Sequence, residues 1–169
     1  MSNTPAALGA YAVRLATGAA ELVRERSGDP MRVTAKSTST DLVTQVDRAS
    51  ERWLVERIRS DRPEDAVLGE EGGAREGRSG VRWVVDPIDG TVNFVLGLPQ
   101  YAVSVAAEID GEVVAGAVCN PASGELFRAT RGGGAWLEDG AVHRLGGPRA
   151  IGLDRAVVGT GFAYDRALR

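Results

Sequence analysis

Apolar residues recur at helical spacing near the start of the chain. Over residues 4–26 they fall at i, i+3, i+4 and i+7, namely at Leu8, Tyr11, Ala12, Leu15, Ala19, Leu22 and Val23. This spacing predicts a long amphipathic helix with one buried stripe. The run Ser27-Gly28-Asp29-Pro30 should end it, because proline lacks the backbone donor that a continuing helix needs.

A second apolar stripe predicts a helix that ends near Ser60. Its members are Val43, Val46, Ala49, Trp53, Leu54 and Ile58. Thr40 or Asp41 is expected to cap its start, and the cap is the ordinary interpretation of Asp41. Asp47 falls beside the stripe. We expect its carboxylate to be hydrogen-bonded or near a cation if it is buried, because burying it alone is expensive; a boundary position half in solvent is the alternative.

The rest of the chain alternates short apolar runs with turn residues. Strands are predicted at residues 66–71, 81–86, 101–109, 112–120, 125–131, 134–139 and 141–145, with a short helix through Phe94. Asp110-Gly111 is a strong signal for a two-residue hairpin. The pattern indicates an α+β fold, with two long N-terminal helices packed on a mostly antiparallel sheet. We expect residues 1–150 to form this domain. Residues 151–169 are expected to begin a second, truncated domain, with a strand at 156–158.

Composition narrows the function classes. Of 169 residues, 43% are apolar and 25% charged, as in soluble globular proteins, and a cytoplasmic location is expected. The net charge of −3 argues against a nucleic-acid partner. The sequence shows neither an apolar run of the roughly 20 residues that a membrane span needs nor a signal peptide. Cys119 is the single cysteine, so an internal disulfide is excluded.

The candidate chemistry lies in the run WVVDPIDGTVNF at residues 83–94. Asp86 and Asp89 follow an apolar strand, and like charges so close together need a cation or a proton between them. Gly90 and Thr91 stand where a helix should begin, and helix starts favour anions such as phosphate. Glu70 ends the preceding strand. Two neighbouring strand ends that both carry carboxylates therefore predict a metal site, although acidic residues at strand ends often lie there only because loops are wet.

Other reactive side chains have ordinary interpretations. His143 is expected on the surface of a hairpin, and Cys119 in the core. Lys36 is expected to be solvated, and a role near an anion or a metal-bound water is the alternative. The tryptophans Trp53, Trp83 and Trp136 are expected to face the core.

Taken together, these motifs resemble the inositol monophosphatase family of magnesium-dependent, lithium-sensitive phosphatases. The resemblance rests on Lys36 followed by DLVTQVD at 41–47, on GEEG at 69–72, on WVVDPIDGTVNF and on TGFAYD at 160–165. It implies the N-terminal part of a layered α/β sugar-phosphatase fold. The family's W-D-x-A-A-G motif does not occur in the sequence. We therefore expect this sequence to lack the C-terminal part of the fold, with the aspartate that completes the second metal site.

The resemblance also implies roles for individual residues. A first Mg²⁺ would be held by Glu70, Asp86 and the carbonyl of Ile88, and Asp86 would bridge to a second, shared with Asp89. Glu70, Thr91 and Asp47 would position the attacking water. The segment Ile88, Asp89, Gly90 and Thr91 would bind the substrate phosphate. Glu71 would lie beside the metal ligands without binding the metal itself.

We therefore expect a Mg²⁺-dependent phosphomonoesterase that hydrolyses inositol monophosphate or a related small polyol or sugar phosphate. A homodimer is expected by resemblance alone. Within the same class, a 3′-phosphoadenosine or fructose-bisphosphate phosphatase is an alternative. In a different class, the alternative is a catalytically incomplete domain that binds metal or a protein partner.

Overall fold

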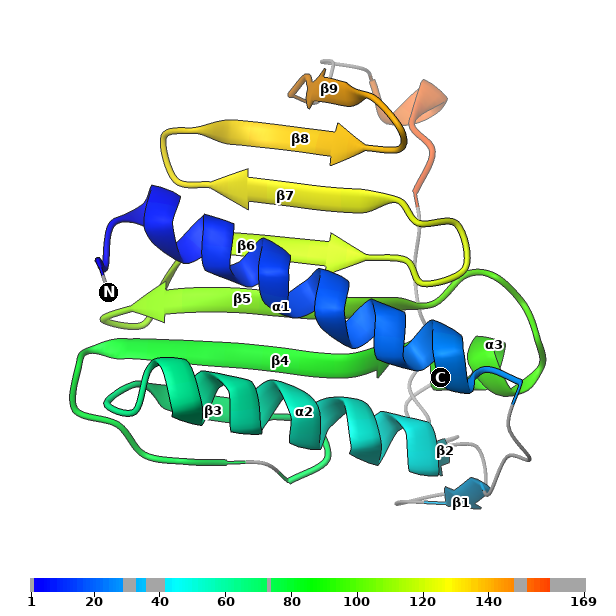
Figure 1. The fold of residues 1–169 in the computed structure, drawn as a ribbon. Coiled ribbons are helices and arrows are strands. Elements are labelled where there is room, and N and C mark those ends of the chain that lie inside the picture. The colour runs from blue at the N-terminus through cyan, green and yellow to red at the C-terminus, as the bar shows by residue number, and fades with distance from the viewer. Residues whose placement is uncertain (1, 29–32, 36–41, 73, 148–151, 159–169) are drawn as a thin grey trace.

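A seven-stranded sheet with two helices across one face forms the body of the molecule (Figure 1). The computed structural model describes residues 2–28, 33–35, 42–72, 74–147 and 152–158. In spatial order the strands are β3 (Ala66–Gly69), β4 (Val81–Asp89), β5 (Ala102–Ile109), β6 (Glu112–Cys119), β7 (Leu126–Thr130), β8 (Gly134–Glu138) and β9 (Val142–Leu145). Within this sheet only β3 and β4 run parallel, and the other neighbours are antiparallel. The predicted α+β meander is confirmed.

Helix α1 (Pro5–Arg26) lies across β5, β6 and β7 (Figure 1). Thr4 caps its start by accepting a hydrogen bond from the backbone N–H of Ala7 at 3.3 Å. The predicted stripe packs on the sheet, except that Leu22 is only half-buried. By length and composition α1 is the one helix of the described part that could cross a membrane, but half of its apolar window is buried inside the molecule.

Helix α2 (Gln45–Asp61) begins later than its pattern predicts. Residues 42–44 instead form strand β2 (Leu42–Thr44), which pairs antiparallel with β1 (Val33–Ala35). Thr44 is the N-cap: its hydroxyl accepts from the backbone N–H of Val46 and of Asp47, and Asp47 accepts in return from the N–H of Thr44. This reciprocal capping box satisfies the orphan donors of the first turn, so the helix starts there. The predicted cap at Thr40 or Asp41 is therefore wrong, and both residues lie outside the described part.

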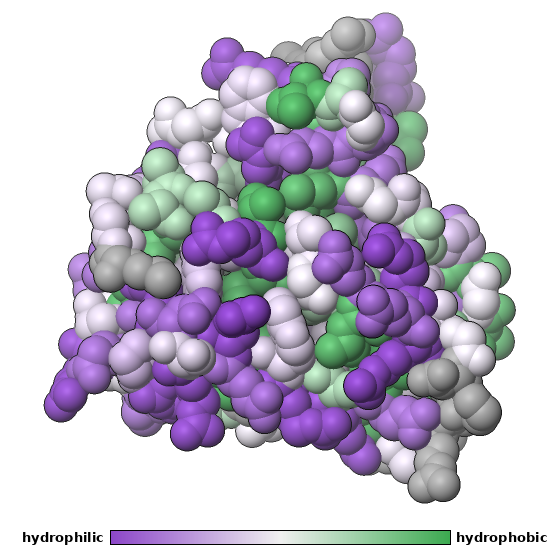
Figure 2. Space-filling model, in the orientation of Figure 1, coloured by the Kyte–Doolittle hydropathy of each residue, from purple (hydrophilic) through white to green (hydrophobic). Residues whose placement is uncertain are grey.

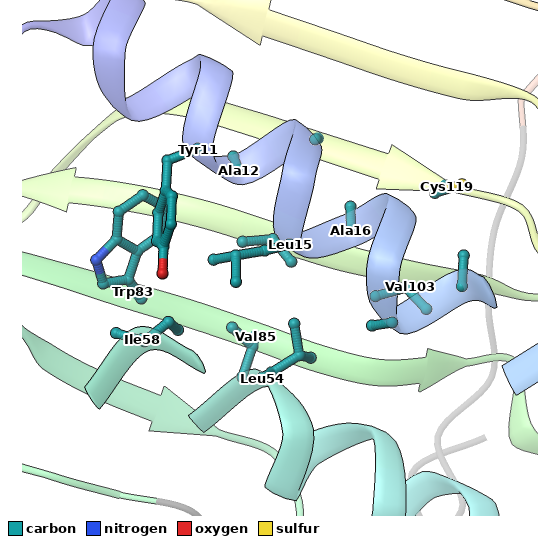
Figure 3. Packing of buried hydrophobic residues seen from close by; sticks show 14 of the residues in the cluster. Tyr11, Ala12, Leu15, Ala16, Leu54, Ile58, Trp83, Val85, Val103 and Cys119 are labelled. Carbon is teal, nitrogen blue, oxygen red and sulfur yellow. The ribbon is translucent and has the colours of Figure 1, made fainter. Parts of the chain in front are cut away.

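The core lies between the two helices and the sheet, where side chains from α1, α2, β4 and β5 point toward one another (Figure 3). Trp83 is fully buried, and its ring meets that of Tyr11 edge-on at 5.1 Å. Trp53 is half-buried but also packs against this core, over Gly18, where a Cβ would lie 2.4 Å from its ring. The expectation that the tryptophans face the core is wrong for Trp136, which is half-buried on β8 outside the core.

A buried ion pair ties the end of α2 to this core. Arg62 pairs with Asp65, and both residues are less than 10% exposed. Asp65 also accepts hydrogen bonds from Trp83 Nε1 at 2.8 Å and from Ser79 Oγ at 2.6 Å. Arg62 donates to the side chain of Asn3 at 2.6 Å. The buried charges are thus compensated by several polar partners, as such charges must be.

The two faces of the sheet differ. Hydrophilic residues predominate on the outer surface of the helical face, over α2 (Figure 2). On the other face, Val118, Phe127 and Leu145 are each more than a third exposed and line a shallow apolar depression.

The strand predicted at 156–158 is wrong: these residues follow a short 3₁₀ helix (Leu153–Arg155) as irregular chain, and Val157 is almost fully exposed.

Candidate functional site

The candidate site lies where β3 ends beside β4, near the start of α2 and beside α3 (Thr91–Val95) (Figure 1). Because the two strands are parallel, with Gly69 opposite Val85, Glu70 follows the end of β3 beside Asp86 of β4. The register thus confirms that Glu70 and Asp86 meet, but Asp86 lies within β4, paired with Ser104, and not at its end.

The strand predicted to end at Asp86 continues to Asp89, and the segment after Asp86 is a bulged part of β4. Asp86 pairs opposite Ser104 and Asp89 opposite Ala102, so three steps along β4 match two along β5. Pro87 has no N–H for the ladder, and a bulge is one of the few places where a sheet accepts proline. The extra residue breaks the alternation of the strand, so Ile88 is buried while Asp89 is exposed.

Asp86 and Glu70 form the acidic centre of the site. Their carboxyl groups lie in hydrogen-bonding contact, and Asp86 is half-buried. Burial, followed by the charge of Glu70 and then that of Asp89, raises the pKa of Asp86 from 3.8 to about 7. The N–H of Ile88 donates to Asp86 Oδ1 at 3.1 Å and partly offsets the rise. The pair thus holds negative charge that the protein alone neutralises poorly.

The third expected carboxylate is not gathered into the same cluster. Within the residues that the structure describes, no three side chains among His, Cys, Asp and Glu form a ready metal-binding group. Asp89 is exposed at the end of β4 and acts on Asp86 through its charge. The structure therefore joins Glu70 with Asp86 and leaves Asp89 at the rim.

The donors at this centre fit a hard divalent cation. Mg²⁺ prefers oxygen ligands and takes only one or two carboxylates while keeping several waters. Glu70, Asp86 and the backbone carbonyl of Ile88 are ligands of that type. A cation between Glu70 and Asp86 would also remove the repulsion that raises the pKa of Asp86.

Asp47 and Thr91 form a second polar pair next to this centre. Asp47 is fully buried, so the interpretation of a boundary residue half in solvent is wrong. Its Oδ1 lies 3.0 Å from Thr91 Oγ1, and its Oδ2 accepts from the N–H and the hydroxyl of Thr44. The expected hydrogen bonding of this carboxylate is confirmed. Thr91 Oγ1 also lies 3.0 Å from the carbonyl oxygen of Ile88, so its one proton is available to either acceptor.

Gly90 makes the sharp change of direction between β4 and α3. Its φ is +87°, in the left-handed region that suits glycine, and a Cβ there would lie 2.9 Å from the carbonyl oxygen of Gln100. The turn places Thr91 at the first position of α3, where the N–H groups of a helix lack partners within the helix. The predicted helix start at Gly90-Thr91 is confirmed.

Two further residues of α2 reach the site, and the sequence pattern did not single them out. Ser50 and Glu51 are buried one turn after Asp47. Ser50 Oγ lies 3.4 Å from the carbonyl oxygen of Pro87, and Glu51 Oε2 accepts from the N–H of Glu71 at 2.6 Å. Their spacing from Asp47, i+3 and i+4, is the signal that could have found them, because it places all three on one helix face.

The remaining candidates lie away from the site or outside the described residues. His143 is exposed and contacts Asp139 at 3.0 Å, and Cys119 is buried in β6, both as predicted. Lys36 lies outside the described part. The side chain of Glu71, the residue after Glu70, is half-buried.

Comparisons with known proteins show which proteins this chain is similar to. The sequence model of the inositol monophosphatase family matches residues 6–168. An inositol-1-monophosphatase of Mycobacterium leprae is 46% identical over 179 aligned positions, which cover 96% of this chain and 62% of that protein. The Escherichia coli K12 protein named Nus factor SuhB is 41% identical, over 90% of this chain and 57% of that one.

A solved structure shares the fold. The structure of Mycobacterium tuberculosis SuhB superposes with a TM-score of 0.71 at 42% identity, over 90% of this chain and 55% of that one. The chain thus spans 62% or less of the length of these three relatives.

Proposed function

Because this chain belongs to the inositol monophosphatase family, we propose that it carries the metal- and phosphate-binding half of a Mg²⁺-dependent phosphomonoesterase site. The observation that carries the proposal is the contact between Glu70, which follows β3, and Asp86 of the parallel strand β4, with Asp47 and Thr91 beside it. Phosphate hydrolysis needs charge neutralised on the phosphoryl oxygens and a water made nucleophilic. This arrangement offers groups for both.

Glu70, Asp86 and the carbonyl of Ile88 are the proposed ligands of Mg²⁺, and Asp89 is the proposed rim carboxylate for a second ion shared with Asp86. Bound Mg²⁺ would neutralise phosphate charge and lower the pKa of a coordinated water. The fixed β3–β4 register supports this assignment, because it keeps Glu70 and Asp86 at the same edge of the sheet.

The proposed role of Asp47 and Thr91 is to orient and deprotonate the attacking water. Asp47 is held rigidly by Thr44, which leaves Oδ1 facing the hydroxyl of Thr91. The lone pairs of Thr91 Oγ1 can accept a hydrogen bond from the water. When the water gives its proton to Thr91 Oγ1, the hydroxyl proton of Thr91 passes to Oδ1 of Asp47, which lies 3.0 Å away. Glu70 can accept the water's second hydrogen and so fix its direction of attack.

The proposed phosphate site is the segment from Ile88 to Thr91. Its backbone turns at Gly90 so that the first N–H groups of α3 follow the acidic residues directly. Such N–H groups suit an anion. The proposed substrate is an inositol monophosphate or a related small polyol or sugar phosphate, in line with the name of the M. leprae relative.

Phosphate release tests the proposal in the complete protein that contains these residues. The substrates are myo-inositol 1-phosphate, 3′-phosphoadenosine 5′-phosphate and fructose 1,6-bisphosphate, each with Mg²⁺ or with a chelator. We expect Mg²⁺-dependent release, fastest from the inositol phosphate, and its loss in Asp86→Asn. Release that is independent of Mg²⁺, or unchanged in Asp86→Asn, would refute the proposal.

A second candidate function is partner binding without turnover. It is favoured by the 41% identity to a protein named Nus factor SuhB. The same assay separates the two: no release from any substrate, combined with a folded protein that binds Mg²⁺, would favour this second function.

A further inference from the structure

Glu51 is a buried acid that the proposed chemistry does not use. It lies on the inner face of α2 and is 5% exposed. Its Oε2 accepts a hydrogen bond of 2.6 Å from the backbone N–H of Glu71. Glu71 directly follows Glu70, a proposed metal ligand. The carboxylate of Glu51 is therefore hydrogen-bonded to the backbone one residue after that ligand.

Glu51 also touches this loop on the other side of Glu70. A Cβ added to Gly69 would lie 2.5 Å from Oε2 and 2.6 Å from Cδ of Glu51. The carboxylate therefore sits directly over the Cα of Gly69, and no larger residue fits there while Glu51 keeps its place. Glu51 thus contacts Gly69 and accepts a hydrogen bond from Glu71, which are the residues directly before and after Glu70.

The same turn of α2 holds the other acidic segment. Asp47 bonds to Thr91 and Ser50 contacts the carbonyl of Pro87, on either side of the segment that follows Asp86. Asp47, Ser50 and Glu51 are all buried and belong to one rigid helix. The helix thus links the end of β3 to the end of β4 independently of the ladder between them.

We propose that Glu51 is a positioning residue that sets where Glu70 lies relative to Asp86. It acts by accepting the hydrogen bond from Glu71 and by filling the space over Gly69. The proposal rests on the proposed function, because it assigns to Glu51 the placement of a Mg²⁺ ligand. Residues that orient metal ligands typically change metal affinity 10–100-fold when replaced.

The test compares Glu51→Ala, Glu51→Gln and the control Glu56→Ala, an exposed glutamate of the same helix. Mg²⁺ affinity is measured by titration calorimetry, and hydrogen exchange of the Glu71 amide is measured without metal. We expect Glu51→Ala to weaken Mg²⁺ binding about tenfold and to speed exchange of that amide about tenfold. Glu51→Gln keeps a side-chain oxygen that can accept the hydrogen bond, so it should stay within about threefold of wild type in both. Glu56→Ala should match wild type.

The two variants keep the test decisive. Unchanged Mg²⁺ affinity and amide exchange in Glu51→Ala would overturn the positioning role. Equal weakening in Glu51→Gln and Glu51→Ala would also overturn it, because the charge of Glu51 and not its hydrogen bond would then matter. If Glu51→Ala does not fold, Glu51→Leu takes its place with the same thresholds, because leucine keeps most of the volume but cannot accept the hydrogen bond from Glu71.

Failure of the proposed function is distinguishable from failure of this inference. Wild-type protein that binds no Mg²⁺ would refute the proposed metal site. The exchange of the Glu71 amide would then still show whether Glu51 holds the loop.

Discussion

The hydroxyl of Thr91 lies 3.0 Å from Oδ1 of Asp47, although 44 residues separate the two in the chain. This contact joins the start of α3 to the start of α2, and both ends lie beside the carboxyl pair of Glu70 and Asp86. Because of this contact, a candidate base, formed by Asp47 and Thr91, lies next to the acidic residues at this end of the sheet.

Thr91→Val removes this contact at nearly constant volume. We expect the free energy of unfolding to fall by about 1–3 kcal/mol, because the buried carboxylate of Asp47 loses a donor. In the complete protein, phosphate release should fall by about 10²–10⁴-fold if the pair takes a proton from water. Urea denaturation and steady-state kinetics measure the two effects. A kcat equal to that of wild type would show that Thr91 has only a structural role.

The raised pKa of Asp86 predicts how stability depends on pH without metal. The carboxyl group has a pKa of 3.8 in its ordinary state and about 7 in the fold, because of burial and the charges of Glu70 and Asp89. The folded chain therefore holds this proton more tightly than the unfolded chain does. The resulting stabilisation is complete below about pH 3.8 and is lost as the pH rises through about 7.

Urea denaturation in the presence of a chelator, between pH 4 and 8, checks this dependence. The difference in unfolding free energy between wild type and Asp86→Asn should change across that window, with the wild type losing stability as the pH rises. Mg²⁺ should bind more tightly toward the upper end, because its ligands must be deprotonated. A difference that stays constant with pH would contradict the assigned pKa.

Gly90→Ala should destabilise the turn into α3. A non-glycine residue at φ +87° costs roughly 1–2 kcal/mol, and the added Cβ would also lie 2.9 Å from the carbonyl of Gln100. The matched control is Gly132→Ala, at φ +76° with open space around the position, which carries the strain without the clash. Thermal denaturation should show a larger loss for Gly90→Ala. Equal losses would mean that the approach to Gln100 relaxes freely.

The buried and exposed ion pairs near the end of α2 should differ sharply. Asp65→Asn leaves the buried Arg62 without its counter-charge, which should cost roughly 3–5 kcal/mol of unfolding free energy. Glu64→Gln, which removes the partner of the exposed Arg78, should leave the unfolding free energy nearly unchanged, because water screens the pair. Urea denaturation compares the two. A similar cost for both would indicate that water reaches Arg62 in the folded state.

Much of the fold could be predicted from local signals. The stripe of α1 and the hairpin at Asp110-Gly111 match the structure because periodicity and turn chemistry are encoded within a few residues. The start of α2 could not be fixed in this way. Thr40, Asp41 and Thr44 are all good cap residues, and the capping box with Asp47 decides between them only once the helix exists.

The site was partly predictable for the same reason. The acidic residues stand at strand ends, and the pairing of β3 with β4 brings Glu70 to Asp86 as expected. The bulge at Pro87 and the role of Glu51 depend on partners from other segments. Glu51 meets Glu71 from 20 residues away, and no local pattern encodes that contact.

The central claim is that Glu70 and Asp86, with the carbonyl of Ile88, hold a divalent cation. Crystals of the protein soaked in Mn²⁺, an anomalous scatterer that takes the same oxygen ligands, test it most directly. We predict an anomalous difference peak within bonding distance of both carboxylates and of the Ile88 carbonyl, and its loss in Asp86→Asn. An anomalous map with no peak at this pair, or with a peak that survives in Asp86→Asn, would contradict the claim.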